Sequence, residues 1–246
     1  MLLIRKDPPS PEVSREINRV KHDVDWDHAD LTDPITARNA FDLLDKSIIR
    51  EQLLKEQKGL CAYCMKKIRN NEKTVIEHWC PIDANPSQAL SYTNMLACCD
   101  GGRKNDTYPH VLSCDAAKGD QTITISPLNE AHMTRIRYRA NGTVSVFPED
   151  AVLAHDINDI LKLNGEVDPS GKVIHDTSTN LVHGRRQVYV RFREFMKRVD
   201  KMHKSVPAII RKRIKELTEV EQYGEYVGVE LYLLRRRLGE KANSGV

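Results

Sequence analysis

Cys61-Ala62-Tyr63-Cys64 is the stretch on which the predicted fold depends, because two thiolates at this spacing on a tight turn can face one ion. A structural zinc ion needs two further ligands, and Cys99 with Cys114 would complete an all-cysteine tetrahedron. A redox pair is the alternative, but such a pair usually accompanies a βαβ pattern, which this sequence lacks. The spacing therefore favours a structural zinc site.

More than one set of downstream ligands could complete the site with Cys61 and Cys64. Cys98 and Cys99 are neighbours, and adjacent side chains rarely reach the same small ion, so one of them is expected to be a spectator. Cys80 is expected to be a buried or incidental thiol. His110 is an alternative ligand, although a single loop histidine is usually solvated.

The composition indicates a chain with a packed core. Of its 246 residues, 40% are hydrophobic and 30% charged, which allows one large domain or a small domain with a helical extension. We see neither a signal peptide nor an apolar run of about 18 residues, so we expect a cytoplasmic protein without membrane contact. In a reducing compartment, six cysteines favour metal ligation over disulfides.

Periodicity and turn signals predict an α+β fold that is mostly helical. A hairpin is expected around Asn141-Gly142, with its strands at 135–139 and 143–147, and a short strand at Thr74–Ile76. We divide the chain into an N-terminal arm and helix (1–58), a metal-bound core (59–130) and a hairpin with a helical region (131–246). Helices are predicted over residues 13–22, 37–58, 151–163, 177–204, 207–217 and 226–238.

The net charge is only +3, but the basic residues are unevenly distributed. A cluster of lysines and arginines lies between Arg185 and Lys215 and can attract phosphate; the alternative is that these residues form the solvated face of long helices. The cluster consists of Arg185, Arg186, Arg191, Arg193, Lys197, Arg198, Lys201, Lys204, Arg211, Lys212, Arg213 and Lys215.

A second motif lies between the cysteine pairs. Glu77-His78 ends a β-like run and is followed by Trp79, which we expect to pack in the core, and by Pro81. Asn94 follows sixteen residues after His78, and Cys114-Asp115-Ala116-Ala117-Lys118 lies beyond.

Together these motifs resemble the HNH, or ββα-metal, endonuclease family. More narrowly, they are similar to the HNH proteins of retron and Septu anti-phage systems, the PtuB type. The resemblance covers roughly residues 1–190 and favours Cys99 over Cys98 as the zinc ligand. Asp115 stands where the general pattern has a metal-binding histidine, and fourteen residues separate Cys99 from Cys114, where that pattern has two. The long insert is a candidate substrate-facing loop.

The resemblance implies a role for each motif residue. His78 would be the general base, and Asn94 would orient its ring by hydrogen bonding. Glu77 and Asp115 would hold a catalytic Mg²⁺ or Mn²⁺, for which carboxylates are suitable ligands. Lys118 would steady a phosphate oxygen.

The resemblance also implies partners. They are a nucleic-acid substrate, DNA more often than tRNA or other RNA, and an ATPase of the PtuA type. In retron systems, the implied partners also include a reverse transcriptase with its DNA–RNA product. The rival interpretation is a non-catalytic zinc module that binds nucleic acid or protein.

Overall fold

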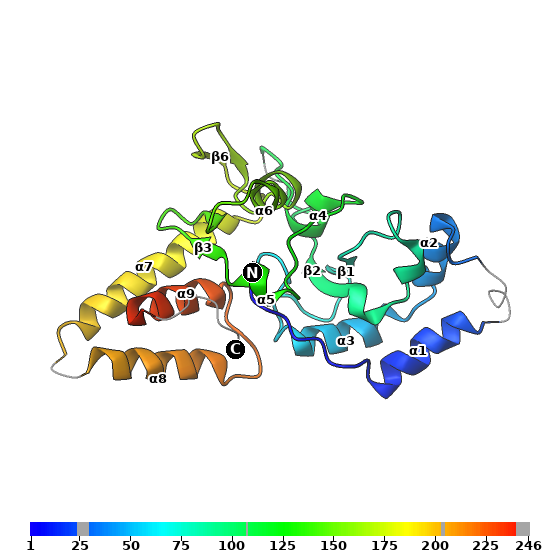
Figure 1. Ribbon diagram of the computed structural model, residues 1–246, viewed down its shortest axis with the longest axis horizontal. Coiled ribbons are helices and arrows are strands. Elements are labelled where there is room, and N and C mark those ends of the chain that lie inside the picture. Colours follow the sequence, from blue (N-terminus) through cyan, green and yellow to red (C-terminus); the bar gives the residue numbers. More distant parts are fainter. Residues whose placement is uncertain (24–29, 107, 203–204, 240–246) are drawn as a thin grey trace.

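The computed structural model describes residues 1–23, 30–106, 108–202 and 205–239. It confirms an α+β chain in which helices predominate and the strands form small antiparallel pairs (Figure 1). Helices α1 (Pro11–Lys21), α2 (Pro34–Asp42) and α3 (Lys46–Glu56) form one end of the molecule. Helices α7 (Leu181–Val199), α8 (Val206–Thr218) and α9 (Val227–Leu238) form the other.

The centre of the molecule contains the hairpin that positions the candidate site. Strands β1 (Thr74–His78) and β2 (Met95–Cys99) pair antiparallel, with Thr74 opposite Cys99 and His78 opposite Met95. The 3-10 turns η1 (Pro86–Gln88) and η2 (Tyr92–Asn94) lie between the strands. Helix α4 (Cys114–Lys118) follows and packs on β2, as does α3.

The remaining elements join this centre to the C-terminal helices. Their bounds are α5 (Glu130–Met133), β3 (Ile136–Tyr138), β4 (Val144–Val146), α6 (Ala151–His155), the π-helical turn η3 (Asp156–Ile160), β5 (Glu166–Val167) and β6 (Val173–His175). The predicted hairpin around Asn141-Gly142 is confirmed as β3 paired with β4. One hydrophobic cluster extends through this region and contains residues from Met1 to Leu233.

Two predicted helices differ in the structure. The helix expected over 37–58 is split into α2 and α3, because Asp45 has extended backbone and its carboxylate accepts a hydrogen bond from the Ser47 N–H, which starts a new helix. The helix expected over 151–163 changes to a π turn at Asp156, whose buried carboxylate accepts from the N–H groups of Thr124 and Ile125.

The long helix expected over 177–204 begins at Leu181, and Lys204 lies outside the described residues. Arg185, the first arginine of α7, was predicted to belong to an exposed basic cluster, and this prediction is wrong. Arg185 is 1% exposed and donates to the carbonyl oxygens of Gly142 (2.7 Å) and Leu163 (2.6 Å), so it ties α7 to the hairpin β3–β4. The other basic residues described on α7 are exposed.

Candidate functional site

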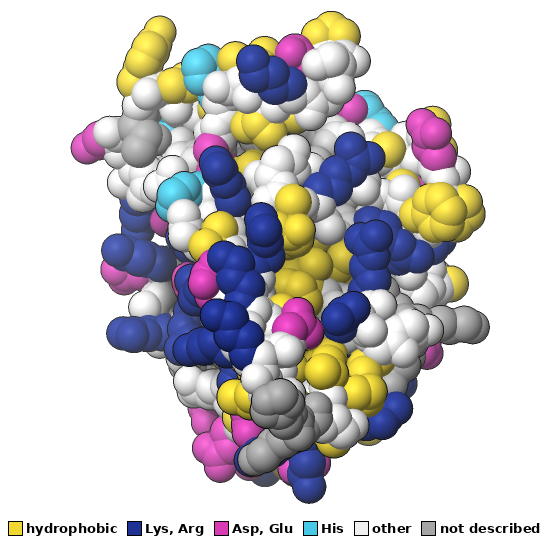
Figure 2. All heavy atoms as spheres, turned by 90° about the vertical axis from the view of Figure 1, so that its left-hand side faces the viewer, with side chains coloured by type: hydrophobic (Ala, Val, Ile, Leu, Met, Phe, Trp, Pro, Cys, Tyr) yellow, Lys and Arg dark blue, Asp and Glu magenta, His cyan; other side chains and the backbone are white. Residues whose placement is uncertain are grey.

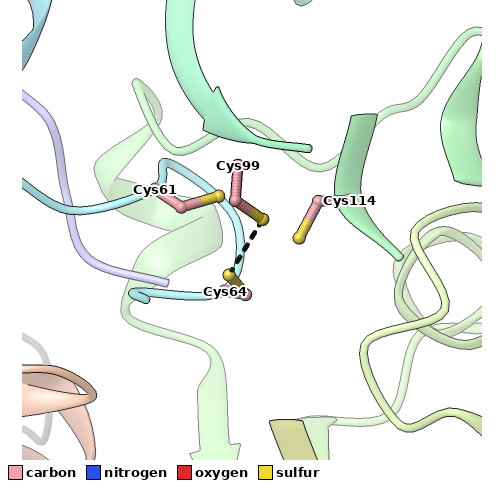
Figure 3. Close-up of side chains that lie close together, drawn as sticks. All are labelled: Cys61, Cys64, Cys99 and Cys114. Carbon is pink, nitrogen blue, oxygen red and sulfur yellow. Dashed lines mark hydrogen bonds between the residues drawn. The ribbon is translucent and has the colours of Figure 1, made fainter. Parts of the chain in front are cut away.

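Four buried cysteines form the first part of the site (Figure 3). The sulfur atoms of Cys61, Cys64, Cys99 and Cys114 all lie within 4.8 Å of one another, and Cys64 Sγ is 3.7 Å from Cys99 Sγ. A tetrahedral zinc ion with Zn–S bonds of about 2.3 Å would separate its sulfurs by about 3.8 Å. The cluster therefore fits a metal ion such as zinc.

The turn that carries the first two ligands is built by its own hydrogen bonds. The Met65 N–H donates to the carbonyl oxygen of Cys61 (3.1 Å), and the Lys66 N–H reaches Cys64 Sγ at 3.5 Å. Burial raises the pKa of the Cys61 thiol, but hydrogen bonds from Cys114 and Cys64 outweigh it and hold the pKa well below its usual range. The contact with Cys114 lowers the pKa of the Cys99 thiol, but contacts with Cys61 and Cys64 outweigh it and raise the pKa of both the Cys99 and the Cys114 thiols well above its usual range. One thiolate is therefore favoured, and a bound cation would be needed to hold the other sulfurs as the thiolates that zinc takes.

The long insert between the last two ligands closes on itself. The Ser113 N–H donates to the carbonyl oxygen of Gly101 (3.0 Å), which returns the chain to the cluster. Gly101 has φ +62, and a Cβ there would lie 2.0 Å from the Ser113 oxygen, so this closure requires glycine. Fourteen intervening residues are therefore compatible with a four-sulfur site.

The open choice among cysteines is decided in favour of Cys99. Cys98 interacts with Cys61 but lies outside the four-sulfur group, since neighbouring strand residues point to opposite faces. Among the described residues, His110 is not part of the group either, because its Nε2 donates to the carbonyl oxygen of Gly102 at 2.7 Å.

A cavity of about 340 Å³ forms the second part of the site. Glu77 and His78 reach it from the end of β1, and Asp115 and Lys118 reach it from α4. The residues from β1 and α4 are about forty positions apart in the sequence, and the packing of α4 on β2 brings them together. Four of the five residues predicted to act beside the zinc are brought to one pocket.

The pKa of the Glu77 carboxyl group is shifted strongly from its ordinary value. Glu77 is 4% exposed and accepts hydrogen bonds from the Tyr63 hydroxyl (3.0 Å) and from Lys118 Nζ (2.7 Å). Burial raises the pKa of Glu77 to about 8; the Lys118 ammonium opposes this shift, and the Asp115 carboxyl adds to it. Two carboxyl groups this close can share a divalent cation that relieves their repulsion.

His78 is held in one orientation. Its Nε2 lies 2.8 Å from the carbonyl oxygen of Ala89, and the Phe41 ring packs edge-on with centroids 4.6 Å apart. A carbonyl oxygen only accepts, so Nε2 carries the proton and Nδ1 carries the lone pair of a neutral ring. Burial lowers the pKa of His78, with Lys118 and Arg38 acting in the same direction, which favours this neutral form.

Basic side chains, Arg103 and Lys118 among them, also line the pocket. Arg103, from the insert after β2, forms an ion pair with Asp115 at 2.6 Å. Lys118 was expected near a phosphate, but its amine is 1% exposed and donates to Glu77 and to the carbonyl oxygen of His78 (3.0 Å). These contacts make Lys118 a residue that positions the Glu77-His78 pair.

Asn94 requires a correction. It was expected to orient the imidazole, but its Oδ1 accepts from the Cys80 N–H (2.8 Å) and its Nδ2 donates to the Cys80 carbonyl oxygen (2.9 Å). The amide therefore fixes the backbone at Cys80, two residues after His78, and the Ala89 carbonyl oxygen takes the expected place beside the ring. Trp79, whose Nε1 donates to the Ile125 carbonyl oxygen, packs against the hydrophobic cluster as predicted.

We expect Asn94→Ala to lower the free energy of unfolding by about 1–3 kcal/mol, because both backbone groups of Cys80 lose their side-chain partner. Chemical denaturation measures this change. The matched control is Asn18→Ala on the exposed face of α1, which should change stability by less than about 0.5 kcal/mol. Equal stability of the two variants would contradict a structural role for Asn94.

Two residues at or behind the pocket have no clear signal in the sequence. Tyr63 lies inside the Cys61–Cys64 turn, is fully buried behind the cavity, and joins the cysteine cluster to Glu77 through its hydroxyl group. Arg38 comes from α2 and pairs with Asp83 (2.8 Å) and Asp120 (3.2 Å) at the rim. Only the approach of α2 to the hairpin places it there.

Among the helices that the structure describes, none has the length and apolarity of a membrane-crossing segment. In comparisons of the sequence with known proteins, no family model and no curated protein matches this chain.

Proposed function

We propose that the protein is a cytoplasmic, metal-dependent endonuclease of the HNH type, stabilised by a zinc ion at the four cysteines. The observation that supports this most is the shared cavity of Glu77, His78, Asp115 and Lys118. A zinc module that only binds would have no need for a buried carboxyl pair beside a neutral imidazole. The order of β1, β2 and α4, with α4 packed on β2, also agrees with a ββα-metal finger.

The fixed tautomer of His78 suits it to act as a general base. Its Nδ1 would take a proton from water, whose oxygen attacks the phosphorus while the bond to the 3′-oxygen breaks. The leaving oxygen takes a proton from solvent, which gives a 3′-hydroxyl and a 5′-phosphate. The hydrogen bond to Ala89 keeps the ring in the orientation that this transfer requires.

The two carboxylates fit a hard divalent cation. Glu77 and Asp115 would hold Mg²⁺ or Mn²⁺, which supplies charge relief for the phosphate and the leaving oxygen. Tyr63 and Lys118 fix the Glu77 carboxylate from two sides. Arg103, whose side chain is partly exposed at the cavity, is placed to contact a phosphate oxygen once Asp115 is engaged by the cation.

Replacing Asp115 by asparagine tests the cation site. We expect the variant to need at least about tenfold more Mn²⁺ for half-maximal cleavage of plasmid DNA, because it loses a charged ligand but retains the shape of the side chain. The measurement is a titration of Mg²⁺ or Mn²⁺ with plasmid DNA, single-stranded DNA and tRNA as parallel substrates. Asp159→Asn, at an exposed aspartate that does not line the cavity, is the matched control.

An unchanged cation requirement in Asp115→Asn would contradict the assignment. If the wild type binds these nucleic acids but cleaves none of them in either metal, the non-catalytic zinc module would be the better description.

The setting of this activity rests on the motif resemblance. We propose an effector role in anti-phage defence, with an ATPase of the PtuA type and, in a retron, the reverse transcriptase and its DNA–RNA product as partners. Co-purification of the tagged protein with the product of a neighbouring ATPase gene tests this role. A chain that stays alone in the presence of that ATPase would contradict it.

A further inference from the structure

A groove of about 780 Å³ lies away from the cavity that contains His78. It is formed by β3 and β4 on one side and by α7 and α9 on the other, and it shares no lining residue with that cavity. The elements that form it lie at the opposite end of the molecule from α1 and α2 (Figure 1). The groove is therefore a separate surface.

The walls of the groove are basic. Arg137 and Arg139 come from the hairpin β3–β4, Arg236 comes from the last turn of α9, and no acidic side chain is among the described residues that line it. Within the described part of the chain, none of these three guanidinium groups forms an ion pair with a carboxylate. Figure 2, which shows this side of the molecule, has lysines and arginines on both sides of a strip of hydrophobic side chains.

The floor of the groove is aromatic and apolar. Tyr138 and Tyr232 are buried and pack edge to face with ring centroids 5.6 Å apart, and Tyr189 is partly buried beside them. Phe147, at the end of β4, is 64% exposed, and Arg137 lies over its ring at 5.7 Å. The Arg137 guanidinium donates to the carbonyl oxygens of Thr134 (2.8 Å) and Ile136 (2.9 Å), and these neutral acceptors leave its charge uncompensated. An exposed ring beside guanidinium groups that have no carboxylate partner suits an unpaired base and its phosphates.

The hairpin presents these groups because of its register. Ile136 and Tyr138 pack in the hydrophobic cluster, where Tyr138 also forms part of the groove floor. The alternating residue Arg137 and its cross-strand partner Ser145 lie on the opposite face of the hairpin and line the groove wall. The close fit of the hairpin on α7, where Arg185 binds the Gly142 carbonyl oxygen, fixes this face relative to the helices.

We propose that this groove binds a single-stranded segment of nucleic acid, with its phosphates on the three arginines and a base on Phe147. The choice of a nucleic acid as the occupant rests on the proposed function. The strand would then be held at two places, in the groove and at the His78 cavity, so the groove would matter for long substrates and not for short ones.

The test measures binding in a chain that cannot cleave. Fluorescence anisotropy of a labelled 30-nucleotide single strand is recorded with His78→Ala and no added divalent cation, so binding is scored whether or not the wild type is a nuclease. We expect Arg139→Glu/Arg236→Glu to raise Kd at least about tenfold and to flatten the dependence of log Kd on log salt by about 1.4. Arg15→Glu/Lys21→Glu on α1, with the same charge change, should stay within about twofold.

A second variant addresses the base contact. Phe147→Ala should weaken binding of the single strand by about fivefold or more and leave binding of the duplex unchanged, because only an unpaired base can stack on the ring. Equal Kd values for the groove and α1 variants would overturn the proposal, as would a preference for duplex. If the groove variants bind the oligonucleotide normally but no longer retain a co-purifying ATPase, the groove is a protein-docking surface and the proposal is wrong.

Discussion

Replacing His78 by alanine is expected to lower the rate of phosphodiester cleavage by about 10²–10⁴-fold. The reason is the fixed ring: Nε2 is engaged by the Ala89 carbonyl oxygen, so Nδ1 is the nitrogen available to a water molecule, and burial keeps the ring neutral. No other described histidine lines the cavity. Single-turnover cleavage of plasmid DNA in Mn²⁺ measures the rate of the chemical step.

The control separates chemistry from folding. His155→Ala removes a histidine whose side chain is 60% exposed, and it should cleave at the wild-type rate. His78→Gln keeps a polar side chain in the cavity, and its rate of cleavage should fall as far as that of His78→Ala. Both His78 variants should keep the zinc content of the wild type and unfold cooperatively, with a lower midpoint because the buried ring loses its hydrogen bond and its packing on Phe41. Cleavage that survives in such folded variants would refute the general-base role.

The second large effect concerns the choice between neighbouring cysteines. We expect purified wild-type protein to contain zinc and Cys99→Ala to lose both zinc and cooperative unfolding. Binding of a structural zinc ion contributes on the order of 10–16 kcal/mol in zinc-finger peptides, whereas a whole domain is stable by only about 5–15 kcal/mol. The loss of one of four ligands is therefore expected to unfold the region around Cys61 and Cys64.

Cys98→Ala is the matched control, because its thiol is equally buried but lies outside the four-sulfur group. It should keep its zinc and unfold cooperatively with a loss of about 1 kcal/mol for the smaller side chain. Metal content by mass spectrometry and unfolding by circular dichroism give the two readouts. Zinc loss in Cys98→Ala and not in Cys99→Ala would reverse the ligand assignment.

Much of the fold could be predicted because its signals are local. The Asn141-Gly142 turn specified the hairpin β3–β4, and a Thr or Ser cap with the break at Pro207 indicated the helices observed as α7 and α8. Strand β2 was missed because Met95–Cys99 is buried on both faces and shows no alternation. Helix α4 was missed because five residues are too few for periodicity to appear.

Sequence alone identified the candidate residues of the site: the spacing of Cys61 and Cys64 indicated a metal pair, and the motif resemblance indicated Glu77-His78 and Asp115. Only the tertiary structure decided which groups meet. It placed Cys99 and not Cys98 with the other three sulfurs, directed Asn94 to the Cys80 backbone, brought the Tyr63 hydroxyl to Glu77 and brought Arg38 to the pocket. Spacing along the chain constrains contacts within one turn or strand, whereas contacts between elements depend on the packing of α2, β1, β2 and α4, which no local pattern encodes.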